Sequence, residues 1–150
     1  MCDSSYLKLY LKEVKKLKVI DELVDAYLQG DNEILYVLNC QTGEILLDAD
    51  ESLTGEPGID WDDEEATEFL VEIPQISSNE AYDVMVQFTN KQNADHVVRL
   101  LDILNGRKPF RFFKEKVNEL GIEEQWHAFE YECAKSRMEE WLEGYAKNLT

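Results

Sequence analysis

The fold is decided by residues 34–47, whose sequence is ILYVLNCQTGEILL. Two runs rich in Ile, Leu, Val and Tyr, at residues 34–39 and 44–47, flank a four-residue connection that ends at Gly43. Aliphatic and aromatic residues of this kind favour strands, and glycine supplies the positive φ that a tight connection needs. The stretch therefore predicts a β-hairpin.

The segments on either side of this hairpin extend the sheet and begin to cover it. Asp21 is expected to cap a helix over residues 21–28, which Gly30 ends. Residues 69–73 are expected to form a third strand, which Pro74 ends because proline has no N–H to donate. The first half thus predicts a small antiparallel sheet made of the hairpin plus one strand.

The second half predicts four helices from their start signals. Ser77 followed by Glu80 has the spacing of a capping box, and Asn93 can cap the next helix. Pro109 suits a first helical turn, and the last helix is expected to begin near Ile122. We therefore predict an α+β fold in which about five helices pack a small antiparallel sheet. A length of 150 residues predicts a single domain over residues 1–150.

Charge is distributed very unevenly along the chain. Residues 19–90 contain nineteen Asp and Glu and no Lys or Arg, and the formal net charge of the whole chain is −17. The five early lysines fall in residues 1–18, where residues 1–17 predict a basic amphipathic N-terminal arm. Because a chain this acidic repels phosphate backbones, we expect no duplex nucleic acid partner.

Cysteine usage and hydropathy indicate the compartment. The three cysteines, Cys2, Cys40 and Cys133, are odd in number and far apart, so neither a disulfide framework nor a zinc site is indicated. Lysines interrupt the apolar residues of the first 17 positions, and no later run approaches the roughly 18 apolar residues that a membrane span needs. We expect a soluble, cytoplasmic protein with no membrane span.

A basic motif surrounds the predicted start of the helix at Pro109, and its cations are Arg107, Lys108, Arg111 and Lys114. Cations at a helix N-terminus lose about 0.3–1 kcal/mol each against the macrodipole, so another interaction must compensate them. Arg107 and Arg111 could pair with the protein's own carboxylates while Phe110 and Phe113 fill the core. They could instead bind a small anionic ligand, a phosphate or a partner's carboxylate, bidentately.

An acidic loop is predicted at residues 48–68, and the carboxylates expected to bind a partner there are Asp60, Asp62, Asp63, Glu64 and Glu65. The loop begins like a calcium loop, but Leu53 and Ile59 occupy the positions of the required Gly and Glu. A basic protein partner suits such a surface, which would speed its association by electrostatic steering. The alternative is a divalent-metal-dependent hydrolase that uses these carboxylates.

Catalytic patterns are lacking in the sequence. The histidines His96 and His127 lie 31 residues apart and have no metal-ligand spacing, and no nucleophile elbow, phosphate loop or dinucleotide fingerprint occurs. Cys133 lies near Glu130 and Glu132, which would raise its pKa and make it a poor nucleophile. We predict no catalytic residue, metal ligand or cofactor. The sequence favours a non-enzymatic binding protein and leaves an enzyme as the alternative.

One motif carries a family resemblance. It runs Gly106-Arg107-x-x-Phe110-Arg111-x-Phe113-Lys114, and continues with Gly121-Ile122-Glu123, Trp126 and Phe129. This pattern resembles a bacterial family catalogued as uncharacterised protein family 0158, with weaker echoes at residues 24–26, 42–44 and 72–74. The resemblance implies a small soluble protein and brings no activity, cofactor or catalytic residue with it. Lys108-Pro109 departs from the family pattern, and residues 1–15 would be an added arm.

Overall fold

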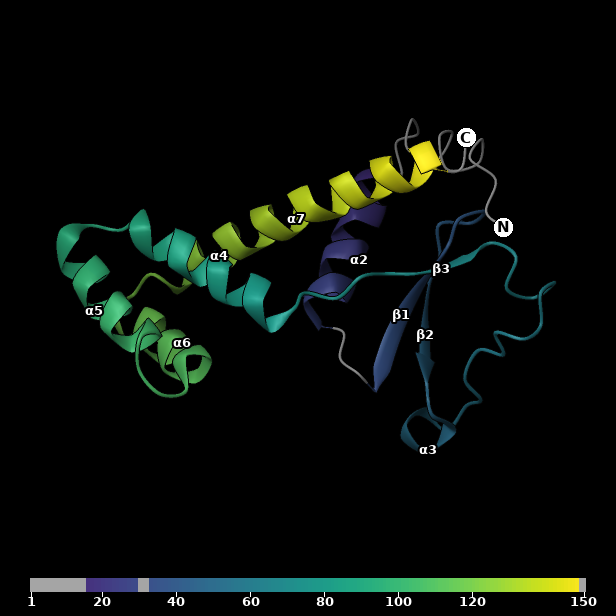
Figure 1. Ribbon diagram of the computed structural model, residues 1–150, viewed down its shortest axis with the longest axis horizontal. Coiled ribbons are helices and arrows are strands. Elements are labelled where there is room, and N and C mark those ends of the chain that lie inside the picture. Colours follow the sequence, from purple (N-terminus) through teal and green to yellow (C-terminus); the bar gives the residue numbers. More distant parts are fainter. Residues whose placement is uncertain (1–15, 30–32, 149–150) are drawn as a thin grey trace. The chain divides into compact units, whose positions relative to one another are not determined.

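The computed structural model describes residues 16–29 and 33–148. It forms two compact units, Met1–Gln75 with Ala134–Thr150, and Ile76–Cys133. The elements of the first unit are α2 (Lys16–Gln29), β1 (Ile34–Asn39), β2 (Ile45–Ala49), α3 (Glu51–Thr54) and β3 (Leu70–Glu72), and those of the second are α4 (Ser78–Asn90), α5 (Ala94–Leu104) and α6 (Pro109–Glu119) (Figure 1). Helix α7 (Glu123–Asn148) begins in the second unit and ends in the first. The α+β class is confirmed, and the expectation of a single domain stays a prediction.

The predicted hairpin and third strand form one antiparallel sheet with the strand order β2-β1-β3. The turn carries Gly43 at φ 76°, and the Asn39 carboxamide oxygen accepts hydrogen bonds from the N–H groups of Gln41 and Thr42 at 2.9 and 3.2 Å. Asn39 thus closes the turn with its side chain while glycine supplies the left-handed residue. The hairpin prediction is confirmed down to the residue that makes the turn.

Strand β1 is the central strand of the sheet. Val37 pairs with Leu46 on β2 and with Glu72 on β3. Neighbouring residues on a strand point to opposite faces, yet Val37 and Leu38 are both buried. The other buried apolar side chains of this unit are Val19, Ile20, Leu23, Val24, Ala26, Tyr27, Cys40, Ala49, Ile73, Ala134, Met138 and Leu142.

Two local predictions for this unit need correction, and a third is not tested. Asp21 does not cap a helix, because α2 begins at Lys16 and Asp21 lies inside it. The acidic loop does not begin at residue 48, because β2 extends to Ala49 and the short helix α3 follows. Most of the predicted N-terminal arm lies outside the described residues. Strand and helix continue past the predicted limits because tertiary packing overrides local capping signals.

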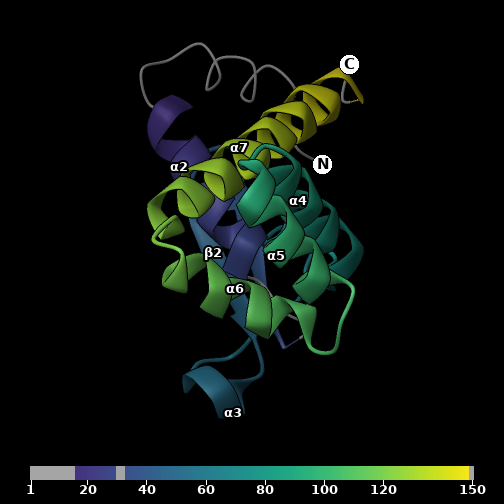
Figure 2. The same cartoon turned by 90° about the vertical axis from the view of Figure 1, so that its left-hand side faces the viewer.

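The second unit is a cluster of helices, with α4, α5 and α6 labelled in Figure 2. These helices share one core that is rich in aromatic residues. The predicted capping box is present, with Ser77 Oγ accepting from the Glu80 N–H, and Asn93 caps α5 through the His96 N–H at 2.9 Å. The core residues are Met85, Phe88, Leu100, Leu104, Phe113, Val117, Ile122 and Trp126. Phe113 stacks edge-on against Trp126 at 5.0 Å and against Phe88 at 6.4 Å, which fixes how α6 packs in this core.

Helix α6 ends at Glu119, and Gly121 follows in the left-handed region at φ 73°. The Ile122 N–H then donates to the Val117 carbonyl at 3.1 Å before α7 begins. This is the helix-ending conformation that the glycine predicted.

Among the described residues, no helix combines the length and apolar composition needed to cross a membrane.

Candidate functional site

The chain after α3 is fastened to strand β2 by the carboxylate of Asp48. Its Oδ1 accepts the Ile59 N–H at 2.9 Å, and its Oδ2 accepts the indole Nε1–H of Trp61, also at 2.9 Å. Gly58 lies so close to the strand that an added Cβ would meet the Ala49 carbonyl oxygen at 2.9 Å. The start of the loop therefore has a defined position on β2.

Gly58→Ala is expected to lower the free energy of unfolding by about 1–3 kcal/mol, because the new methyl group would force the loop from β2. Urea unfolding followed by circular dichroism measures this. Gly144→Ala is the matched control, since a Cβ at Gly144 meets nothing within 4 Å inside α7, and it is expected to stabilise the chain by about 0.5–1 kcal/mol. Equal effects from the two substitutions would contradict the close approach of Gly58 to β2.

The loop beyond Trp61 is ordered by turns that use its own aspartates. Asp60 Oδ1 accepts the Asp62 N–H at 3.1 Å, and Asp63 Oδ1 accepts the Ala66 N–H at 3.1 Å. The Thr67 hydroxyl donates to the Asp63 carbonyl at 2.8 Å. Aspartate side chains that bond the backbone two or three residues ahead hold such a turn without a strand or helix.

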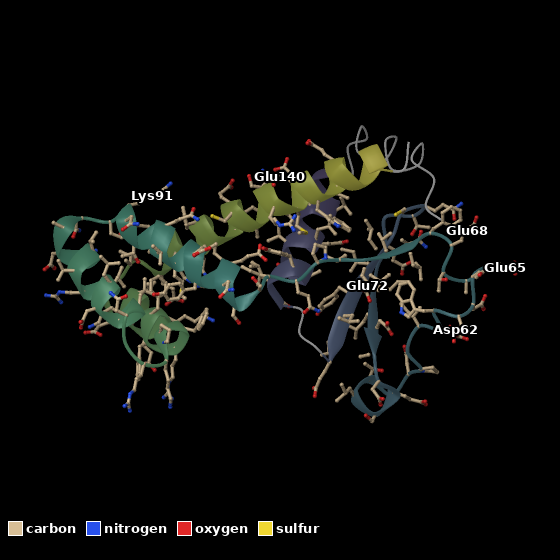
Figure 3. All side chains as sticks on the ribbon, in the orientation of Figure 1. Asp62, Glu65, Glu68, Glu72, Lys91 and Glu140 are labelled. Carbon is tan, nitrogen blue, oxygen red and sulfur yellow. The ribbon has the colours of Figure 1, made fainter. Side chains whose placement is uncertain are left out.

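The five predicted partner-binding carboxylates, Asp60, Asp62, Asp63, Glu64 and Glu65, all lie on this loop and are exposed. Figure 3 shows Asp62, Glu65 and Glu68 projecting from the loop between α3 and β3, away from the strands. The structure therefore places the predicted residues together on one segment. Whether they bind a partner stays a prediction.

Trp61 is the residue that sequence reasoning missed. Its side chain is 41% exposed although its indole N–H is held by Asp48. Trp is rare on surfaces and frequent at binding hot spots, since it combines a large apolar ring with a polar edge. A lone Trp inside a run of carboxylates was the available signal. We name Trp61 and the carboxylates of residues 60–68 the Trp61 surface.

An open pocket of about 470 Å³ adjoins this surface between β2 and the loop. The residues that line it include the apolar Leu35 and Ile59 and the acidic Glu33, Asp50 and Glu51. The Ser52 side chain, and then the Ser52 N–H that the Asp50 carboxylate accepts at 2.8 Å, lower the pKa of this carboxyl below the ordinary value of 3.8. The pocket thus offers apolar and anionic groups together.

The basic motif lies at the start of α6 and is exposed. Arg111 Nε pairs with Glu115 Oε1 one turn onward at 3.3 Å, and its guanidinium lies 5.9 Å from the centre of the Phe112 ring. Arg107 and Lys108 have no ion pair with any described residue. The predicted internal pairing is therefore limited to Arg111, and it is an exposed pair of the kind that contributes little stability.

Phe110 is not a core residue, which corrects the prediction. It is 38% exposed, as is Phe112 at 40%, whereas Phe113 is fully buried. Lys108 starts the helix in the left-handed region at φ 49° and provides no side-chain cap. The start of α6 thus presents cations and aromatic rings to solvent, which we name the α6 surface and define as Arg107, Lys108, Phe110, Arg111 and Phe112.

Lys114, the fourth cation of the motif, is exposed, and its charge acts on Glu130 of α7. Partial burial raises the pKa of the Glu130 carboxyl above its ordinary value of 4.5, and the charges of Lys114 and His127 oppose that shift. Lys114 thus partly compensates a half-buried carboxylate on α7.

Replacing Glu130 with Gln is expected to stabilise the protein at pH 7. A carboxyl group with a raised folded-state pKa binds more protons when folded, so stability falls as pH rises through that pKa. The advantage of Glu130→Gln should disappear as pH falls below about 4.5, where Glu130 is neutral in both states. Thermal unfolding of both chains from pH 3 to 8 measures this, and a constant difference over that range would contradict it.

Cys133, His127 and His96 have side chains of the kinds used in catalysis or metal binding. Burial is the main cause that raises the pKa of the Cys133 thiol, with Glu132 contributing in the same direction and Lys91 opposing it. His127 lies exposed beside Glu123 at 3.4 Å, and His96 lies 3.5 Å from the Asn93 carboxamide. In the parts of the chain with described side chains, no three His, Cys, Asp or Glu residues gather as metal ligands.

Comparison with known proteins identifies a family. The model of a family described as "Uncharacterised protein family (UPF0158)" matches residues 15–148. Neither a curated protein nor a solved structure matches the chain.

Proposed function

This chain belongs to the uncharacterised protein family UPF0158, and from that premise we propose that it is a non-enzymatic binding protein that engages a basic segment of a partner protein. The Trp61 surface is the binding site. A single observation carries the proposal: an exposed tryptophan, fixed by Asp48, stands within a loop of six carboxylates and no cation at residues 60–68.

The physical fit is to Arg and Lys side chains. An exposed indole face attracts a guanidinium or ammonium group by about 0.5–1 kcal/mol, and Trp is the best aromatic residue for this contact. Neighbouring carboxylates repel one another, so a cation that approaches them relieves that repulsion as well as forming ion pairs. Because Asp48 and the aspartate turns already order the loop, less conformational entropy is lost on binding.

The pocket beside the loop also suits Arg and Lys side chains. The methylene stem of an Arg or Lys side chain can lie along Leu35 and Ile59, while its charged head reaches the carboxylates of Asp50 and Glu51. A partner segment with two or more basic residues could then use the pocket and Trp61 together. This favours a Lys/Arg-rich segment over an isolated basic residue.

Isothermal titration of the full chain with a short peptide of alternating Arg and Ser tests the proposal. We expect saturable binding that weakens steeply as salt is raised, and loss of part of the affinity in Trp61→Ala. A peptide of alternating Glu and Ser is the matched control and should not bind. Failure of the Arg peptide to bind at low salt would overturn the proposal.

A further inference from the structure

The α6 surface has the opposite chemistry to the Trp61 surface. It contains three cations, Arg107, Lys108 and Arg111, and no carboxylate, in a chain whose net charge is −17. Two phenylalanine rings, Phe110 and Phe112, are exposed among these cations. The Trp61 surface carries six carboxylates and one exposed aromatic ring within nine residues.

We propose that the α6 surface of one copy of this chain binds the Trp61 surface of a second copy. This inference rests on the proposed function, because it names the chain itself as one source of the basic segment. The guanidinium groups of Arg107 and Arg111 would fork onto carboxylates of the acidic loop, and Phe110 would meet the ring of Trp61.

Charge complementarity favours this occupant over a nucleic acid strand. Beyond Arg111, the cations of α6 alternate with carboxylates, because Glu115 pairs with Arg111 at 3.3 Å and Glu119 pairs with Lys116 at 3.1 Å, so α6 has no continuous basic stripe for a phosphate backbone to follow. The cations of the α6 surface instead form a short cluster that matches a compact carboxylate group. The acidic loop is such a compact group of carboxylates, and it also carries the ring of Trp61.

The contact is head-to-tail, because its two halves are different surfaces. A copy that has bound through its α6 surface still has its Trp61 surface available.

Self-association through this contact should be strongest at an intermediate salt concentration. At low salt the net charge of −17 on each copy opposes approach, at about 0.15 M salt that repulsion is screened beyond roughly 8 Å while contact pairs persist, and at high salt the pairs weaken too.

Complementation between two variants tests this inference by sedimentation velocity at protein concentrations up to about 1 mM, the range of weak contacts. The loop variant carries Asp60→Asn, Asp62→Asn, Asp63→Asn, Glu64→Gln and Glu65→Gln, and the α6 variant carries Arg107→Gln, Lys108→Gln and Arg111→Gln. We expect self-association of the native chain, none in either variant alone, and association in their mixture, because the mixture restores one intact contact.

A third variant controls for net charge. Lys91→Gln, Arg99→Gln and Lys135→Gln remove three cations elsewhere and should leave self-association unchanged. A native chain that stays monomeric at every salt concentration, self-association that survives in the loop variant, or a mixture that does not associate would each overturn the inference. If the native chain stays monomeric yet binds the Arg peptide, the inference falls and the proposed function stands.

Discussion

Neutralising the five predicted partner-binding carboxylates is expected to weaken binding of an Arg-rich peptide by about a hundredfold at low salt. The change replaces Asp60, Asp62 and Asp63 by Asn and replaces Glu64 and Glu65 by Gln. Exposed ion pairs contribute about 0.2–1 kcal/mol each, and five of them give about 2.7 kcal/mol, which is a hundredfold in affinity. Isothermal titration of native and variant chains measures the difference.

The matched control changes the net charge by the same five units at other exposed carboxylates: Glu22, Asp25, Glu124, Glu140 and Glu143. Long-range attraction to a basic peptide falls equally in both variants, so only the loop variant should lose the local contacts. The difference should shrink as salt is raised. If the control loses as much affinity as the loop variant, the peptide responds to net charge and the Trp61 surface is not a site.

Replacing Phe113 with alanine is expected to lower the free energy of unfolding by about 3–5 kcal/mol. Its side chain is fully buried and touches Trp126 and Phe88 edge-on, so the substitution removes apolar contacts and leaves a cavity that surrounding helices cannot fill. Urea unfolding followed by circular dichroism measures the loss. This is a large share of the 5–15 kcal/mol that typical domains have.

Phe112 provides the comparison, because it is the next residue in the same helix and is 40% exposed. Phe112→Ala is expected to change the free energy of unfolding by about 0.5 kcal/mol or less. A similar loss from both substitutions would show that the two rings are equally buried and would contradict the packing of α6 described above.

The features that the sequence predicted well are those set by neighbouring residues. The hairpin turn depends on Asn39 and Gly43, and the start of α4 depends on Ser77 and Glu80, which are three residues apart. Such contacts form within one turn of chain, whatever packs around them. Residue type and spacing were therefore sufficient.

The features that it missed depend on distant partners. Trp61 is held by Asp48, thirteen positions earlier, and no local pattern links an aspartate in a strand to a tryptophan in a loop. Phe110 and Phe113 are both apolar and three residues apart, so helical spacing placed both in the core. Only the packing of α6 decides that Phe113 is buried and Phe110 is exposed.

Fluorine NMR on the chain labelled with 5-fluorotryptophan tests the central claim most directly. The protein has three tryptophans, and Trp61→Phe assigns the resonance of Trp61, while Trp126 is buried in the core of its unit. Titration with the Arg peptide is predicted to shift the Trp61 resonance and to leave that of Trp126 in place. Saturable peptide binding that leaves the Trp61 resonance unmoved would contradict the assignment of the Trp61 surface as the binding site.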